Sequence, residues 1–247
     1  MTIVEPINPH HRAESDTTSF GSFHVTDQTK GAFEVTTVEN DARVDLGSLF
    51  ILAVLCGCIV ATILGMAVAN ENDGHLELAW TKPVSRTLYL LQTAAIGVLG
   101  IVLAEVMTVL AIATIMAMYG LAYLIHVSNL TLRDIAFSLL VALAFYAIVQ
   151  AMTASTRRTG WAIVSIFWVV SLILPVFHHT EWLNVGSIVR IVNVVNPNAY
   201  FYSFTALPAN PGFMALPGSA TAYFTGLLVL VVAGIGLAIA QWQRVEA

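Results

Sequence analysis

The chain has 247 residues, of which 57% are hydrophobic and only 10% are charged, with a formal net charge of −5. A soluble domain carries about 25% charged residues, so this composition excludes a soluble protein and indicates an integral membrane protein. The ten lysine and arginine residues are scattered along the chain, which excludes nucleic acid as a partner. Because lipid cannot satisfy backbone hydrogen bonds, spanning segments must be helices or a closed barrel, and we predict an all-α polytopic membrane protein.

The first predicted region is a polar, extracytoplasmic N-terminal segment, residues 1–47. It begins with MTIVEPINPHHRAESDTTSF, which lacks the apolar core of a signal peptide. Residues 21–40 alternate apolar and polar side chains around a turn-like Thr29-Lys30-Gly31, so a small hairpin is expected there.

Five segments follow that are apolar and long enough to cross a membrane, which takes about 20 residues of helix. They are residues 48–69, 88–118, 135–154, 160–177 and 220–242. The membrane domain therefore covers residues 48–247.

The second segment is long enough to raise the alternative of a tight hairpin turning near Glu105. No Pro, Asn or Gly-Gly pair stands there to make such a turn. With a single crossing, the basic residues of the loops between spans and of the C-terminal end divide five against two: Lys82, Arg86, Arg157, Arg158 and Arg244 against Arg133 and Arg190. The positive-inside rule makes the first side cytoplasmic. We therefore predict one crossing and a cytoplasmic C-terminus, in the plasma membrane, which in bacteria is the inner membrane.

Glu105 is the only acidic residue within a predicted span. A charge near the bilayer centre costs about 2.5–3.5 kcal/mol on insertion scales, so this side chain is expected to face the bundle interior or a partner. Two interpretations stay open. The carboxyl lines a pathway for substrate or protons, or it is protonated or hydrogen-bonded and holds helices together, with Thr108 within helical reach. Gln150 lies close to the cytoplasmic end and is interpreted as solvated.

Residues 178–219 form a long exterior segment before the last span. Residues 182–192 are apolar but too short to cross, and the aromatic run Tyr200-Phe201-Tyr202 follows. This pattern is typical of an interfacial or re-entrant element with an aromatic belt. An ordinary loop lying on the headgroups is the alternative.

A charged interruption, ENDGHLELAWTKPVSR at residues 71–86, separates the first two spans. Asn70 can cap a short helix whose third residue is Asp73. On that helix Asp73 and Glu77 share one face, while Trp80 belongs to an apolar face. Such a helix lies flat on the membrane with its acids toward the cytosol.

The end of the interruption returns the chain to the membrane. Pro83 ends the short helix, and Ser85 is placed to cap the next span, which starts at Arg86. The whole stretch is therefore predicted to be a cytoplasmic elbow on which another protein can dock.

The elbow carries Glu71-x-x-Gly74-x-Leu76-Glu77-Leu78 followed by Pro83-Val84-Ser85-Arg86. This spacing resembles the signature of the type-2 ABC transporter permease family, where it follows the second of six membrane helices and faces the ATPase. The resemblance extends over about residues 40–247. It implies eight residues that couple to an ATPase: Glu71, Asp73, Gly74, Leu76, Glu77, Pro83, Ser85 and Arg86.

By this resemblance the five predicted spans correspond to family helices two to six. The first family helix has no counterpart, and residues 1–47 would be what remains of the loop between helices one and two. We expect that a preceding helix, absent from this chain, explains how a segment without a signal peptide reaches the outside. His75 stands where the family more often has Thr or a similar residue.

The chain carries no motif for hydrolysing ATP. A P-loop needs Gly-x-x-x-x-Gly-Lys-Ser/Thr, and neither Lys30 nor Lys82 fits. No His-Glu-x-x-His or Gly-x-Ser-x-Gly occurs either, so the chain is expected not to be an enzyme, with ATP-Mg bound by a separate P-loop ATPase subunit. The sequence His178-His179-Thr180-Glu181 is interpreted as a solvated polar loop rather than a metal site.

By this family resemblance, the sequence predicts the permease subunit of an ABC transporter, an exporter, paired with a second permease copy or a homologous permease. The alternative is a non-transporting or truncated membrane subunit with a structural or regulatory role.

Overall fold

The computed structural model describes residues 43–67, 86–154, 159–175, 186–206, 216 and 218–244. These residues are almost entirely helical. The longer elements are α1 (Leu46–Gly65), α4 (Arg86–Met118), α5 (Thr131–Thr153), α6 (Gly160–Ile173), α7 (Gly186–Val194), α8 (Pro197–Ala206) and α9 (Ala220–Arg244). The only strands in this part of the chain are β1 (Val44–Asp45) and β2 (Ile125–His126), which form one short parallel pair. The 3-10 turn η1 (Ala122–Leu124) directly precedes β2.

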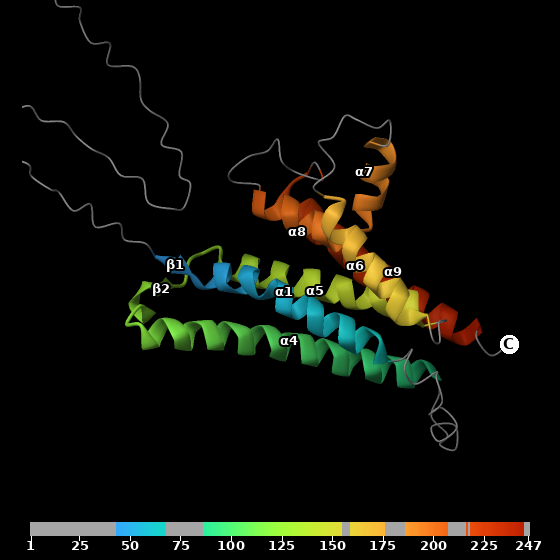
Figure 1. Cartoon of the computed structure of the whole chain (residues 1–247), viewed down its shortest axis with the longest axis horizontal. Helices are drawn as coiled ribbons and strands as arrows, with labels where there is room; N and C mark the ends of the chain where they lie inside the picture. The colour runs from blue at the N-terminus through green and yellow to red at the C-terminus, as the bar shows by residue number, and fades with distance from the viewer. Residues whose placement is uncertain are drawn as a thin grey trace, which may run out of the picture. The chain divides into compact units, whose positions relative to one another are not determined.

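Helix α5 lies at the centre of the described bundle and packs against α1 and α9 (Figure 1). Positions along α1 meet positions along α5 in the same order: Gly47 lies against Thr131 and Gly65 against Val149, so the two helices run in the same direction. Gly97 of α4 meets Tyr146, whereas Glu105 lies level with Ala142, so α4 runs the opposite way. The end of α1 and the start of α4 therefore lie at the same end of the bundle.

Small residues allow these helices to approach closely. A Cβ at Gly234 of α9 would lie 2.9 Å from the backbone of Ala147 in α5, and a Cβ at Gly97 would lie 2.6 Å from the ring of Tyr146. Lipid is as apolar as the helix surfaces, so association depends on such close packing and on hydrogen bonds between helices. These glycines therefore set the spacing of α4, α5 and α9.

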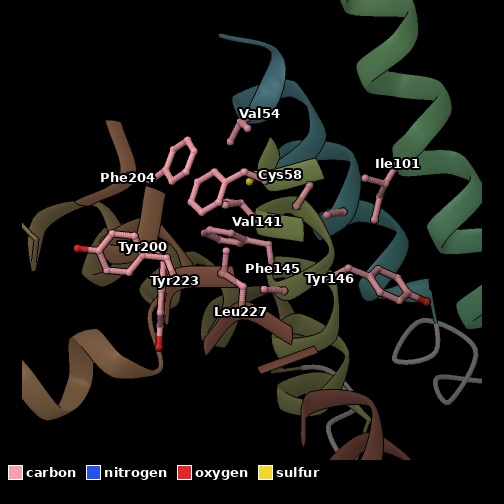
Figure 2. Close-up of a cluster of buried hydrophobic side chains, with 14 of the residues drawn as sticks. Val54, Cys58, Ile101, Val141, Phe145, Tyr146, Tyr200, Phe204, Tyr223 and Leu227 are labelled. Carbon is pink, nitrogen blue, oxygen red and sulfur yellow. The ribbon is translucent and has the colours of Figure 1, made fainter. Parts of the chain in front are cut away.

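Aromatic side chains fill the core between α5 and the last helices (Figure 2). Phe137 of α5 stacks on Phe204 of α8, with ring centroids 3.8 Å apart. Phe145 contacts Trp168 of α6, and Tyr200 contacts Tyr223 of α9. This packing fixes α8 against the bundle.

A polar cluster joins the start of α1 to the loop before α5. The Asp45 carboxylate accepts hydrogen bonds from the backbone N–H and the hydroxyl of Ser128, both at 3.1 Å, and from the hydroxyl of Thr131. Partial burial would raise the pKa of Asp45, but the hydrogen bonds from Thr131 and Ser128 outweigh it and hold the pKa below its ordinary value of 3.8. The cluster adds to the β1–β2 pair in anchoring this end of the bundle.

Four of the described helices are long and apolar enough to cross a membrane: Leu46–Gly65, Leu90–Met118, Thr131–Thr153 and Ala220–Gln241. The described part of the protein is thus a helical bundle with four candidate spans, as expected for a polytopic membrane protein. Helix α4 continues without a break through Glu105, as the single-crossing interpretation requires. The predicted span 160–177 is shorter than expected, since α6 ends at Ile173 after 14 residues. Pro175 contributes to the early end, because it has no backbone N–H to donate to the Ser171 carbonyl, which accepts from Asn196 instead.

Helices α7 and α8 occupy part of the predicted exterior segment. Helix α7 buries Asn193 completely and leaves Ile191 and Val194 exposed, at 70% and 51%. The Asn196 side chain donates to the backbone carbonyl of Ser171 at 2.9 Å and ties the turn after α7 to α6. The apolar outer face of α7 is the arrangement expected of a segment whose surface meets lipid.

Three predicted features lie outside the described residues. They are the hairpin in residues 21–40, the elbow up to Ser85 and the polar sequence His178-His179-Thr180-Glu181.

Candidate functional site

Glu105 lies completely buried between α1, α4 and α5. The hydroxyl of Ser138, on α5, lies 2.7 Å from its Oε2 atom and 2.9 Å from the backbone carbonyl of Phe50, on α1. The second carboxyl oxygen, Oε1, is buried without a hydrogen-bond partner among the described residues and faces Gly57. One carboxyl thus connects three helices.

The number of protons in this contact constrains its chemistry. The Ser138 hydroxyl has one proton and two acceptors within reach, the Phe50 carbonyl and Glu105. A neutral Glu105 satisfies both, because its O–H donates to Ser138 while Ser138 donates to Phe50. A charged carboxylate would compete with Phe50 for that one proton and leave a buried charge without a basic partner. The geometry therefore favours the protonated carboxyl.

Thr108 is not the partner that the helical spacing suggested. Its hydroxyl donates to the carbonyl of Ala104 on its own helix, at 2.8 Å. Ser138, 33 positions along the chain, takes the place expected for Thr108. A pathway role for Glu105 stays a prediction.

Gln150 is a functional candidate that the sequence interpretation missed. It was expected to be solvated, but its side chain is fully buried on α5, and neither its amide nitrogen nor its oxygen has a hydrogen-bond partner among the described residues. The neighbouring Thr153 is satisfied, since its hydroxyl donates to the carbonyl of Val149 at 2.8 Å. The expectation was wrong because proximity to a helix end does not show which way a side chain faces. The one local signal for an inward-facing Gln150 is that small and polar residues follow it within the predicted span, at residues 151, 153 and 154.

An open hollow of about 500 Å³ lies between α1 and α6. The indole N–H of Trp168 donates to the hydroxyl of Thr62 at 2.9 Å and joins the two helices there. Trp161 is 56% exposed at the edge. The lining is Ile59, Thr62, Ile63, Trp161, Val164, Ser165 and Trp168. The Thr62 hydroxyl is already engaged, because it also donates to the Cys58 carbonyl at 2.8 Å. A surface of this kind can bind an apolar molecule.

A second cavity, of about 400 Å³, lies between α5, α6, α7 and α9. Its floor includes Ala151 and Gly234, and its polar groups come from Ser171, Asn196 and Gln241. Its volume falls in the range of about 300–1,000 Å³ that is typical of small-molecule sites.

The structure does not test the predicted coupling residues. Glu71, Asp73, Gly74, Leu76, Glu77, Pro83 and Ser85 lie outside the described residues, and Arg86 is described only as the first residue of α4. Within the described part of the chain, no group of three or more His, Cys, Asp or Glu side chains is placed to hold a metal ion.

No protein-family model, no curated protein and no solved structure matches the chain. The fold and the composition by themselves define the class of the protein, which is an α-helical, multi-pass membrane protein.

Proposed function

We propose that this chain is the membrane-spanning permease subunit of an ABC exporter, coupled through the elbow at residues 71–86 to a separate P-loop ATPase. The observation that carries the proposal is the elbow sequence, placed between two apolar helices. The arrangement of α1 and α4 supports it. These neighbours run in opposite directions, and the 20 residues 66–85 connect their adjacent ends.

In this proposal the protein crosses the membrane five times, with α6 as the short fourth crossing. Its 14 residues span about 21 Å, less than the hydrocarbon thickness of about 30 Å. The turn to α7 and α8 would cover the rest of the hydrocarbon thickness. Residues 1–47 then lie outside and the C-terminus lies in the cytoplasm, which in a bacterium fits the inner membrane.

We assign the cargo-facing surface to the hollow between α1 and α6. Helix α1 leads directly toward the elbow, so a movement of the elbow would shift the wall that carries Ile59 and Thr62. ATP and magnesium would be bound by the partner ATPase.

The central test is whether a P-loop ATPase co-purifies with this chain from its native cells, together with ATP turnover by the assembled complex. The double substitution Asp73→Ala, Glu77→Ala should leave the membrane bundle folded and weaken the association. A partly buried ion pair would lose about 2–5 kcal/mol of association, and a solvated one only a few tenths. Trp80→Ala should instead lower expression, because it removes the contact of the elbow with the membrane. Unchanged association and turnover in the double variant would rule out the elbow as the coupling element.

The orientation has its own test. Single cysteines replace Ser22 or Ser155 in a background where Cys56 and Cys58 are alanine. An impermeant thiol reagent applied to intact cells should label position 22 and not position 155. The opposite pattern would reverse the orientation.

A further inference from the structure

The cavity between α5, α6, α7 and α9 has an apolar rim. Val170, Val195 and Leu237 stand at its edge, exposed at 39%, 53% and 52%. The floor is formed by the central helix, with Ala151 buried. An exposed apolar rim would be unfavourable in water. The walls on α5 and α9 belong to helices that are long and apolar enough to cross a membrane. The mouth of the cavity therefore faces acyl chains.

The two ends of the cavity differ in polarity. At one end the polar groups of Ser171 are satisfied: Asn196 donates to its carbonyl at 2.9 Å, and Asn198 donates to its hydroxyl at 3.1 Å. At the other end the Gln241 side-chain oxygen is buried and has no donor among the described residues. An unsatisfied acceptor at one end of an otherwise apolar cavity calls for a ligand with one hydrogen-bond donor and a long apolar part.

The position of that acceptor fits a lipid. Gln241 lies three residues before the end of α9 at Arg244, close to where the helix leaves the membrane. Leu230, the cavity residue farthest from it along α9, is 11 residues away, about 16 Å along the helix. A lipid with its headgroup at Gln241 would thus extend its chain along α9 toward Leu230.

We propose that this cavity binds one acyl chain of a bilayer phospholipid, with a hydrogen-bond-donating headgroup held by Gln241. The donor is a hydroxyl or an ammonium group, as in phosphatidylglycerol or phosphatidylethanolamine. Phosphatidylcholine has neither and binds less well. This site is separate from the hollow between α1 and α6 and does not depend on the proposed transport function.

The test uses the full chain in vesicles of each of these three phospholipids, each with a trace of a phospholipid that has the same headgroup as the bulk lipid and carries a photoactivatable group on its acyl chain. Cross-linked residues are mapped by peptide mass spectrometry. We expect labelling at Ile148, Met152 and Leu230 to exceed, by at least threefold, labelling at Leu99 and Leu103 on the exposed face of α4. Equal labelling at both places would reduce the cavity to ordinary lipid contact and overturn the proposal.

Two matched pairs of variants separate filling from misfolding. Ala233→Trp fills the cavity from α9, while Ala240→Trp places the same side chain at an exposed position of α9 that does not line it. Val170→Trp and the non-lining Val169→Trp form the same pair on α6. The filling variants should reduce cavity labelling at least fivefold and their controls should not. Unchanged labelling in a filled variant that elutes as the folded protein would contradict the proposal.

The headgroup is tested by Gln241→Leu, which removes the acceptor at nearly constant volume. In the unsubstituted protein, labelling in phosphatidylethanolamine or phosphatidylglycerol should exceed that in phosphatidylcholine by at least threefold, and in the variant this difference should disappear. Preference for only one of the two donors identifies the headgroup. A difference that persists in Gln241→Leu, or cross-links to a second protein copy in place of lipid, would refute the assignment.

Discussion

Gly57 on α1 faces the carboxyl of Glu105 on α4 so closely that a Cβ at position 57 would lie 2.5 Å from Oε1. Ala142 on α5 borders the same space, at 3.2 Å from that Cβ position. The absence of a side chain at Gly57 is therefore what allows the buried carboxyl to fit between three helices.

Gly57→Ala should destabilise the protein by about 1–3 kcal/mol, the usual cost of overpacking a filled core. Chemical unfolding in detergent measures it. Gly236→Ala is the matched control, because a Cβ at Gly236 would meet nothing within 4 Å. Adding Glu105→Ala to Gly57→Ala should recover part of the loss, since the clashing carboxyl is gone. Equal stability of the two glycine variants would show that the contact is not tight.

Glu105→Gln should unfold within about 0.5 kcal/mol of the unsubstituted protein. The amide nitrogen can donate to Ser138 as the neutral carboxyl does. Ser138→Ala removes the bond between helices and should cost about 0.6 kcal/mol, the average measured for such bonds in a membrane protein. ATP turnover by the complex with the ATPase should fall in Glu105→Gln if the carboxyl serves the pathway. A Gln variant that does not accumulate, or falls apart in detergent, would make the carboxyl structural.

Gln150→Leu should stabilise the protein by about 1–3 kcal/mol, because leucine removes buried amide groups that have no partner among the described residues. Thermal unfolding of the purified protein measures the gain. The exposed Gln92, on α4, gives the control, and Gln92→Leu should change stability by less than about 0.5 kcal/mol. A gain in stability accompanied by lost ATP turnover would mark Gln150 as functional. A loss of stability would mean that the amide has a partner.

Asp45 should make stability depend on acid pH. Its folded-state pKa lies below the ordinary value of 3.8, so its contribution is complete above pH 3.8 and is lost as the pH falls through the folded-state pKa. The unfolding temperature should therefore drop more steeply below this pH in the unsubstituted protein than in Asp45→Asn. Parallel curves for the two proteins would show that the hydrogen bonds from Ser128 and Thr131 do not favour the charged form.

The sequence by itself determined the helical spans. Segments of this composition are stable only in a lipid environment, where the backbone must satisfy its hydrogen bonds within the helix. No local turn signal interrupts α4 near Glu105, so one long helix is expected there. Pro175 lies within the predicted span 160–177, and its missing backbone N–H is a local signal that accompanies the early end of α6. These properties depend on residues close together in the chain, so they can be predicted locally.

The tertiary structure alone decided what the buried polar groups contact. Glu105 meets Ser138 rather than Thr108, and Gln150 faces inward, because the rotation of each helix and the identity of its neighbours set these contacts. The cavity above α5 has the same origin: it exists because α6, α7 and α9 leave space over one face of the central helix. Packing between segments far apart in the chain produces such features, and local sequence patterns carry no record of it.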